Sequence, residues 1–499
     1  MIFLGIDCGT QSTKTVAIDR ASGELLASAK SNHRMLPSSS PGAMEQDPDD
    51  WVEAANITIR SVLEQLGSRK NEVRGIGVSG QQHGLVVLDG ANRVVRPAKL
   101  WCDTSTTAQC EEIHAHFGGP EKLLELTGNP VLAGYTASKV LWLRQNEPDN
   151  WARTTSVLLP HDFLNFWLTG EKRMEYGDAS GTAFLDVRTR RWCEPVVDFL
   201  AADLASKLPA LGSSTEAVGR VRGSLLSEWG IEGPVLVSAG GGDNMMSAIG
   251  TGNTSSGVVT ASLGTSGTLY AFSEIPAVDP RGEVAAFCDS TDHWLPLVCT
   301  MNVTLVTEAV RDLFSWCHED FDTAIRTVPP GSDGLLLLPY LSGERTPNLP
   351  GASGVLHGLT VANFTPVHLA RAAIEGVTLG LGHGLQRLRD LGICPTEIRV
   401  TGGGSNSSSW RQLCADIFGV PVVGLANGEG ASFGAALQAA WQAGQEAGDS
   451  QTLGEFTADF VSCDESSRAI PEESVGTIYR ESADRASRLR QALTDKHLL

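Results

Sequence analysis

The chain has 499 residues, a formal net charge of −20 and an apolar fraction of 41%, values typical of a globular protein too long for one ordinary core. Such an acidic chain argues against nucleic acid or an anionic membrane as the main partner, because both attract basic patches. The ten cysteines are scattered singly and no apolar run approaches the ~18 residues of a membrane span, so we expect a reduced, cytoplasmic protein of two domains.

The chain opens on a predicted β-hairpin with a polar turn. Two short apolar runs flank the turn, and the end of the first run and the turn itself hold Asp7, Gly9, Thr10 and Lys14. Backbone N–H groups, hydroxyls and an ammonium group can hold phosphate oxygens there, while a carboxylate can hold a hydrated Mg²⁺. The spacing is not that of a P-loop, and an ordinary hairpin with a polar tip explains the stretch equally well.

Other stretches predict scaffold elements. Asp47 followed by Pro48 predicts a helix to about residue 66, because an N-cap acid and an N1 proline favour helix initiation. Thr365 and Pro366 predict a helix to about residue 390 in the same way. Residues from about 115 to 225 are expected to be mostly helical, with no assignable role. Close packing of another element is predicted along the later helix by a stripe of Gly376, Gly380 and Gly384.

A strand predicted at residues 73–79 ends in the turn Gly80-Gln-Gln-His-Gly84. Ligands collect at the ends of strands in open α/β sheets, so Gln82 and His83 are candidate partners for the hydroxyls of a polyol. A lone histidine is nevertheless more often structural. Trp101 and Asp103 follow and offer an aromatic wall and a further acid.

The centre of the chain places a carboxylate at a strand-to-helix turn. An apolar, β-branched run at 235–237 leads through three glycines to Asp243 and Asn244, where a helical pattern begins. We expect the helix N-terminus to lower the pKa of Asp243. The segment is followed by a second hairpin pattern with hydroxyls in its turn, at Gly264, Thr265 and Ser266.

This second hairpin repeats the first one. Gly264 follows Gly9 at an offset of 255 residues, about half the chain, and β-type sequence flanks both turns. Two phosphate-binding hairpins, one per half, predict two similar lobes with a nucleotide between them. A linker-like stretch at 250–257 marks the predicted hinge.

Another glycine-rich strand-to-helix turn lies in the second half. A strand predicted at 398–401 leads to a helix near residue 409. The exposed backbone of this turn suits adenine or ribose, although a tight turn without a ligand fits the pattern as well. The turn contains Gly402, Gly403, Gly404 and Asn406.

Taken together, these motifs resemble the FGGY family of carbohydrate kinases from about residue 3 to residue 440. One family signature is matched by Gly354-Val-Leu-His-Gly358-Leu, an eight-residue gap and His368-Leu-Ala-Arg-Ala-Ala-Ile-Glu375. The resemblance implies an α/β fold of two actin-like (ribonuclease H-like) ATPase domains, with mixed sheets flanked by helices and a cleft between them. It places most of the sugar site in residues 1–250 and most of the nucleotide site in residues 251–499.

The resemblance also implies cofactors. ATP or ADP is expected in the cleft, and Mg²⁺ is expected to be held through water by Asp7 and Asp243. The first hairpin is similar to the first phosphate motif of the family, the second hairpin to its second phosphate motif, and the later turn to its adenosine motif. The implied nucleotide-binding residues are Gly9, Thr10, Lys14, Gly264, Thr265, Ser266, Gly402, Gly403, Gly404 and Asn406.

The turn at 80–84 is similar to the sugar loop of the xylulose kinases, whereas glycerol kinases carry an Arg-Glu pair there. Many bacterial xylulose kinases differ by a Met at the position of Gln82, and by an Arg where this chain has Ser105. The resemblance implies phosphorylation of the terminal hydroxyl of a ketopentose, D-xylulose first of all, with Asp243 as the catalytic base. The implied sugar-binding residues are Gln82, His83, Trp101, Asp103 and Asn244.

Three alternatives stay open. The first is a kinase for another ketose or polyol such as ribulose. The second is an actin-like ATPase serving as chaperone, filament or sugar-responsive regulator, and the third is an inactive sugar-binding protein. A polar sugar loop beside an acid argues against the second, and the presence of Asp7, Lys14 and Asp243 argues against the third. The expected partners are a small sugar and a nucleotide, and a homodimer is compatible with this reading.

Overall fold

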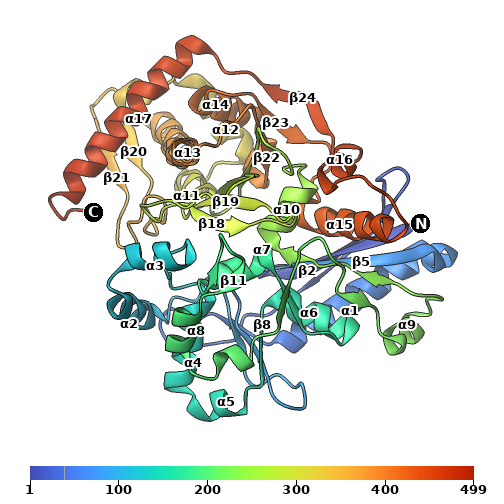
Figure 1. The fold of residues 1–499 in the computed structure, drawn as a ribbon. Helices are drawn as coiled ribbons and strands as arrows, with labels where there is room; N and C mark the ends of the chain where they lie inside the picture. The colour runs from blue at the N-terminus through green and yellow to red at the C-terminus, as the bar shows by residue number, and fades with distance from the viewer. Residues whose placement is uncertain (39) are drawn as a thin grey trace.

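The computed structural model describes residues 1–38 and 40–499, with helices and strands in a mixed α/β arrangement. Two seven-stranded sheets organise the chain, one from each half. Figure 1 shows the blue-to-green elements of the first half below the yellow-to-red elements of the second, with helices flanking both sheets. The predicted architecture of two mixed sheets flanked by helices is therefore confirmed.

The first sheet grows from the N-terminal hairpin. β1 (Ile2–Cys8) pairs antiparallel with β2 (Ser12–Asp19) and parallel with β5 (Val73–Gly80), which confirms the predicted hairpin and strand. The remaining strands of this sheet are β3 (Leu25–Asn32), β13 (Gly219–Arg220), β14 (Leu236–Val237) and β15 (Gly241–Gly242).

Helices cover both faces of β1. Its even-numbered residues pack with Trp51 of α1 (Pro48–Leu66), whereas Phe3 packs on the opposite face in the cluster that contains Phe433. A strand buried on both faces reads as an unbroken apolar run, which explains the pattern at the start of the chain. As predicted, Asp47 caps α1, and its side chain accepts a hydrogen bond from a backbone N–H of the first turn.

The helix on that opposite face comes from the far end of the chain. α15 (Gly430–Glu446) lies beside β5 and the N-terminus in Figure 1 and also crosses α10 (Asp243–Gly250). Glycines make the close approach possible, because a Cβ at Gly77 would overlap the backbone of Ala435 and one at Gly434 would overlap the backbone of α10. The second half thus supplies a layer of the first.

The second sheet is built around another hairpin. β16 (Val258–Leu263) pairs antiparallel with β17 (Gly267–Ala271) and parallel with β22 (Glu397–Thr401), which confirms the predicted second hairpin and the later strand. Its other strands are β18 (Ala285–Cys288), β19 (Trp294–Thr300), β23 (Val422–Leu425) and β24 (Cys463–Ala469). The helices of this half also include α11 (Thr304–Leu313), α12 (His318–Thr327), α14 (Ser408–Phe418), α16 (Leu453–Ala458) and α17 (Glu473–Thr494).

The long helix α13 (Pro366–Asp390) begins and ends where the sequence predicts, with Thr365 as its N-cap. Its glycine stripe is only partly a packing device. Cβ atoms at Gly376 and Gly384 would collide with residues of neighbouring strands, whereas a Cβ at Gly380 would meet nothing within 4 Å. The predicted close approach therefore holds at the two ends of the stripe.

Residues 115–225 are less helical than predicted, because short strands alternate with the helices. β8 (Ser156–Leu158), for example, pairs with β6 (Val86–Leu88), a partner remote in sequence that local patterns do not reveal. The other short strands of the chain are β4 (Glu45–Gln46), β7 (Ala98–Lys99), β9 (Arg173–Glu175), β10 (Leu185–Asp186), β11 (Arg191–Trp192), β12 (Ala210–Gly212), β20 (Leu336–Leu338) and β21 (Val355–His357). The helices of this part are α2 (Thr107–Phe117), α3 (Pro120–Thr127), α4 (Thr136–Asn146), α5 (Pro148–Arg153), α6 (Pro160–Thr169), α7 (Tyr176–Ala179), α8 (Glu194–Leu200) and α9 (Gly223–Trp229).

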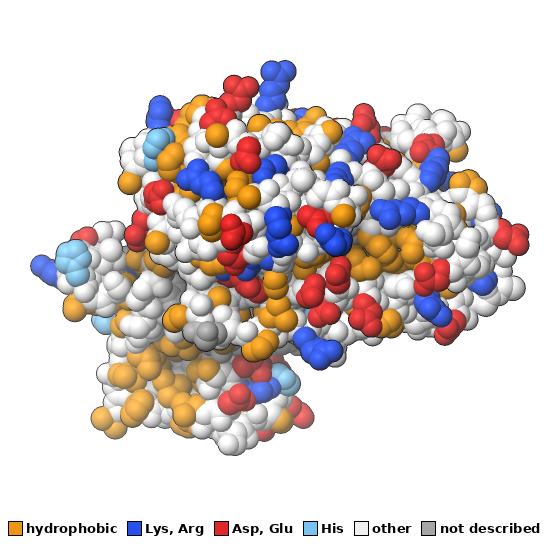
Figure 2. Space-filling view, turned by 90° about the horizontal axis from the view of Figure 1, so that it is seen from below, with side chains coloured by type: hydrophobic (Ala, Val, Ile, Leu, Met, Phe, Trp, Pro, Cys, Tyr) orange, Lys and Arg blue, Asp and Glu red, His pale blue; other side chains and the backbone are white. Residues whose placement is uncertain are grey.

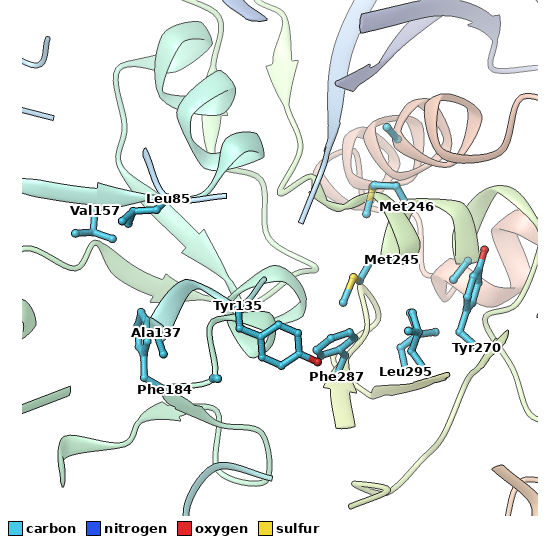
Figure 3. Packing of buried hydrophobic residues seen from close by; sticks show 14 of the residues in the cluster. Leu85, Tyr135, Ala137, Val157, Phe184, Met245, Met246, Tyr270, Phe287 and Leu295 are labelled. Atoms are coloured by element: carbon cyan, nitrogen blue, oxygen red, sulfur yellow. The ribbon is translucent and has the colours of Figure 1, made fainter. Parts of the chain in front are cut away.

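One apolar cluster joins the two halves. Figure 3 shows Met245 of α10 near Phe287 and Leu295 of the second sheet, with Tyr135 of the first half beside Phe287. The ring centres of Tyr135 and Phe287 are 6.2 Å apart. Aromatic side chains from both halves are buried in this one cluster, and their packing holds the two halves together.

Acidic and basic side chains are mixed over the face seen in Figure 2, with apolar side chains between them, although the net charge is −20. Within residues 1–38 and 40–499, no helix has both the length and the apolar character needed to cross a bilayer.

The glycine contacts predict opposite effects of one substitution at two sites. Gly434→Ala should lower the free energy of unfolding by at least about 2 kcal/mol, because its new methyl group meets backbone that cannot move aside. Gly380→Ala is the matched control in open space and should raise it by up to about 1 kcal/mol through helix propensity. Chemical denaturation measures both, and equal effects would contradict the close crossing of α10 and α15.

Candidate active site

Three neighbouring parallel strands end at the same level and bring the predicted acids together. Asp7 pairs with Ser79 across β1 and β5, and Gly241 pairs with the same Ser79 across β15 and β5. Asp243 follows directly as the first residue of α10, with Gly242 as the N-cap. The carboxyl ends of these strands therefore place Asp7, Asp243 and the turn that begins at Gly80 around one point.

A cavity of about 260 Å³ opens at this point. Residues from both halves of the chain line it, and four of the five predicted sugar-binding side chains are among them, together with Asp243. The lining includes Gln82, His83, Trp101, Asp243 and Asn244 from the first half and Ser262, Ser266, Thr268, Glu283, Cys299 and Arg345 from the second.

Hydrogen bonds fix the wall of this cavity next to the acid. The Asn244 backbone N–H and side-chain amide donate to Asp243 Oδ1 at 2.8 and 3.0 Å. The same amide donates to Gln82 Oε1 at 2.8 Å, while Gln82 Nε2 contacts Met245 Sδ at 3.3 Å. The three polar side chains thus form one connected edge.

His83 lies deeper and is held as a neutral ring. Its centre is 4.6 Å from that of Tyr135 and 5.7 Å from that of Phe287. Burial and then the nearby charges of Lys139 and Arg345 hold the pKa of His83 well below its usual range. A neutral imidazole offers one donor and one acceptor, which suits a hydroxyl group.

Asp103 is the predicted sugar residue that does not reach the cavity. Its carboxylate is fully buried, lies 3.1 Å from Lys99 Nζ, and accepts hydrogen bonds from Ser105 and the backbone of Met44. Asp103 is thus absent from the cavity lining described here, and its contact with sugar stays a prediction. Because a buried ammonium neutralises it, Asp103 holds the loop that carries Trp101.

The electrostatics of the two acids reverse the expectation from the helix N-terminus. Burial, followed by repulsion from Asp7 and Asp178, raises the pKa of Asp243 to about 7, against the opposing hydrogen bonds of Asn244. Burial also raises the pKa of Asp7, although Ser79 Oγ donates to it at 2.8 Å. Desolvation outweighs the helix dipole because the dipole contributes only about 1 kcal/mol near a surface.

The carboxylates of Asp7 and Asp243 repel each other, so a cation between them would be stabilised. Carboxylate oxygens completed by water are the ligands that Mg²⁺ prefers, so Asp7 and Asp243 fit a hydrated magnesium ion. Within the part of the chain that the structure describes, no group of three or more His, Cys, Asp or Glu side chains forms a closed metal cage.

The first hairpin turn is tied to both neighbouring walls. Trp101 Nε1 donates to Thr10 Oγ1 at 2.9 Å, and Thr10 Oγ1 donates to Gln81 Oε1 at 3.2 Å. Lys14 forms an ion pair with Glu429, which precedes α15. In the second turn the carbonyls of Gly264 and Thr265 accept backbone N–H groups at the start of α11, at 2.9 and 3.1 Å.

A second cavity of about 700 Å³ lies at the glycine-rich turn after β22. Gly402 has a φ of +85°, and a Cβ there would lie 2.8 Å from Leu263 backbone atoms, so glycine is required. The sequence interpretation missed the opposite wall, which carries no motif because amphipathic helices read as ordinary scaffold. The lining includes Gly403, Gly404, Asn406 and Trp410 on one side and Thr304, Arg311, His318 and Phe321 on the other.

Known proteins share both halves of this architecture. Residues 2–250 match the N-terminal domain of the FGGY family of carbohydrate kinases, and residues 259–443 match its C-terminal domain. The xylulose kinase of Haemophilus influenzae is 40% identical over 490 residues, covering 97% of this chain and 98% of that protein.

Solved structures agree with this assignment. A structure described as a xyloylose kinase from Brucella ovis superposes with a TM-score of 0.92 at 32% identity, covering 99% of this chain and 100% of the other. A gluconate kinase from Lactobacillus acidophilus reaches the same TM-score at 25% identity, with 99% and 98% covered. The chain belongs to the FGGY family of carbohydrate kinases.

Proposed function

We propose that this kinase transfers the γ-phosphoryl group of ATP to the terminal hydroxyl of a ketopentose, with D-xylulose as the first candidate and D-xylulose 5-phosphate as the product. The observation that carries the proposal is Asp243 at the edge of a cavity of about 260 Å³, a volume suited to a small sugar. The 40% identity to a xylulose kinase over nearly the whole chain supports the choice of sugar.

Asp243 serves as the base. As the sugar oxygen forms its bond to the γ-phosphorus and the bond to ADP breaks, the carboxylate takes the hydroxyl proton. A pKa of about 7 suits this role, because a base works best near the operating pH. The loose transition state of phosphoryl transfer asks mainly for positioning, which the Asn244 and Gln82 hydrogen bonds supply.

The nucleotide occupies the larger cavity, with adenosine at Gly402, Gly403, Gly404 and Asn406. Its phosphates extend toward the two hairpin turns, where Gly9, Thr10, Lys14, Gly264, Thr265 and Ser266 offer N–H groups, hydroxyls and an ammonium group. Lys14 must then exchange its ion pair with Glu429 for a phosphate oxygen. Mg²⁺ held through water by Asp7 and Asp243 would neutralise charge on the phosphate oxygens.

Residues 1–250 then carry most of the sugar site and residues 251–499 most of the nucleotide site. The cavities support this division in part: Gln82, His83 and Asp243 line the smaller one and the turn after β22 lines the larger one, but residues of the second half such as Ser266 and Arg345 also line the smaller one. Small sugar and nucleotide are the only partners that the reaction requires, and a homodimer stays a prediction for sedimentation analysis.

A kinase for another acceptor is the second candidate. Gln82 differs from the Met of many bacterial xylulose kinases, and the gluconate kinase structure shares the fold at a TM-score of 0.92. Coupled assays on a panel of ketoses, polyols and sugar acids at fixed Mg-ATP decide between them. ATPase activity that no acceptor stimulates would overturn the proposed function.

Asp243→Asn should abolish phosphorylation of the ketose while ADP still binds, because an amide cannot accept the proton and the nucleotide cavity lies elsewhere. We expect a loss of turnover of at least about 1000-fold. A coupled assay measures turnover and calorimetry measures ADP affinity. Turnover within about tenfold of the unmodified protein would rule out this base.

The same variant should be the more stable protein at high pH. The pKa of Asp243 is about 7 in the folded protein and about 4 in the unfolded chain. Between about pH 4 and about pH 7 unfolding therefore releases a proton, so the unmodified protein loses stability as the pH rises. A neutral amide carries no such penalty, so Asp243→Asn should gain about 1–3 kcal/mol at pH 8 and little at pH 5. Denaturation at both pH values checks this, and a gain independent of pH would contradict it.

Gln81 and Gln82 are adjacent but face different ligands. Gln82→Ala should raise the KM for sugar about threefold to tenfold and leave the KM for ATP unchanged, because its amide lines the smaller cavity. Gln81→Ala is the matched control, since its side chain hydrogen-bonds Gln46 and Thr10 beside the phosphate turn, and it should act on ATP. Identical effects of the two changes would refute this division.

A further inference from the structure

Arg345 stands out in the wall of the sugar cavity. It belongs to the loop after β20, in the stretch Gly343-Glu-Arg-Thr-Pro347, and comes from the second half of the chain. Among the described residues that line this cavity, it is the one Lys or Arg side chain, opposite Gln82, His83 and Asp243 of the first half.

The backbone that carries Arg345 is firmly anchored. The preceding Glu344 is buried and accepts hydrogen bonds from Met301 N at 2.6 Å and Asn302 Nδ2 at 3.0 Å. Asn302 Nδ2 also donates to the carbonyl of Gly343 at 2.6 Å. Thr346 Oγ1, on the other side, donates to the Glu283 carbonyl at 3.1 Å. Such anchoring holds a functional side chain in position before any ligand arrives.

The guanidinium group, by contrast, has few protein partners. No described Asp or Glu side chain forms an ion pair with it, and within residues 1–38 and 40–499 its one hydrogen-bond acceptor is Cys299 Sγ, 3.9 Å from Nη1. Its central carbon lies 5.9 Å from the Trp101 ring. A Cβ at Gly134 would lie 3.6 Å from a terminal nitrogen, so the side chain reaches across to the first half.

The first-half wall of the cavity offers few free hydrogen-bond donors. Asp243 accepts hydrogen bonds, Gln82 Oε1 is already occupied by Asn244, and the neutral ring of His83 supplies one N–H at most. A guanidinium carries five N–H donors in a planar fork, and the hydroxyl and carbonyl oxygens of a sugar accept them. A half-buried cation without strong acceptors gains most from a ligand that supplies them.

We propose that Arg345 is a sugar-recognition residue, which donates hydrogen bonds from the second half of the chain to oxygens of the acceptor while Gln82 and Asn244 hold it from the first half. The inference rests on the proposed function, because it needs a polyhydroxy acceptor in this cavity. A sugar held in this way touches both halves, so its binding favours the arrangement in which Asp243 and the phosphate turns face each other.

The test uses the full-length protein, D-xylulose and ADP. Arg345→Gln should weaken the affinity for D-xylulose about tenfold to hundredfold, because this is the loss expected when one hydrogen bond from a charged donor is removed. Calorimetry without nucleotide measures this affinity. ADP affinity and Tm should be unchanged, and Arg345→Lys should restore part of the sugar affinity. The matched control is Arg480→Gln on the exposed side of α17, outside the cavity, and should change none of these.

Kinetics separate recognition from a purely structural role. In Arg345→Gln the KM for sugar should rise while the KM for ATP stays constant. Unchanged sugar affinity, or equal losses for sugar and ADP together with a lowered Tm, would overturn the inference. If the unmodified protein prefers another polyhydroxy acceptor, D-xylulose is the wrong substrate. The affinity of Arg345→Gln for that other acceptor then tests the role of Arg345. Failure to phosphorylate any acceptor would overturn both.

Discussion

The close contact of α15 with β1, β5 and α10 is the constraint on which the site depends. α10 begins with Asp243, and the residue before α15 is Glu429, the partner of Lys14. Because glycines allow these backbones to touch, both helix starts are fixed to the strand that carries Asp7. Packing in the core, rather than hydrogen bonds at the surface, therefore sets the spacing of Asp7, Lys14 and Asp243.

Burial has the largest effect on the pKa values of Asp243 and His83. A carboxylate at a helix N-terminus gains from the dipole, yet the pKa of Asp243 is raised to about 7 because desolvation and a second acid outweigh that gain. The protein thereby accepts a local loss of stability to place a group that takes up a proton near neutral pH. His83, buried beside cations, is shifted in the opposite direction and stays neutral.

Local chemistry made much of the fold predictable. The helix caps Asp47 and Thr365 and the two hairpins can be predicted, because the residues that define each of them are close in the sequence. The burial of Asp103 could not be predicted, because its carboxylate is held by the backbone of the remote Met44 as well as by the nearby Lys99. The wall formed by α11 and α12 and the part played by Arg345 escaped for the same reason, since each depends on contacts between segments far apart in sequence.

The hydrogen bond from Trp101 Nε1 to Thr10 Oγ1, 2.9 Å long, has an energetic consequence. The indole lines the smaller cavity, whereas the hydroxyl sits in the first hairpin turn, which we propose as a phosphate-binding turn. A ligand that displaces the indole thus alters the environment of the hydroxyl, and thermodynamic reciprocity requires the converse. This hydrogen bond can therefore couple binding at the two places, and any such coupling free energy has the same value in both directions.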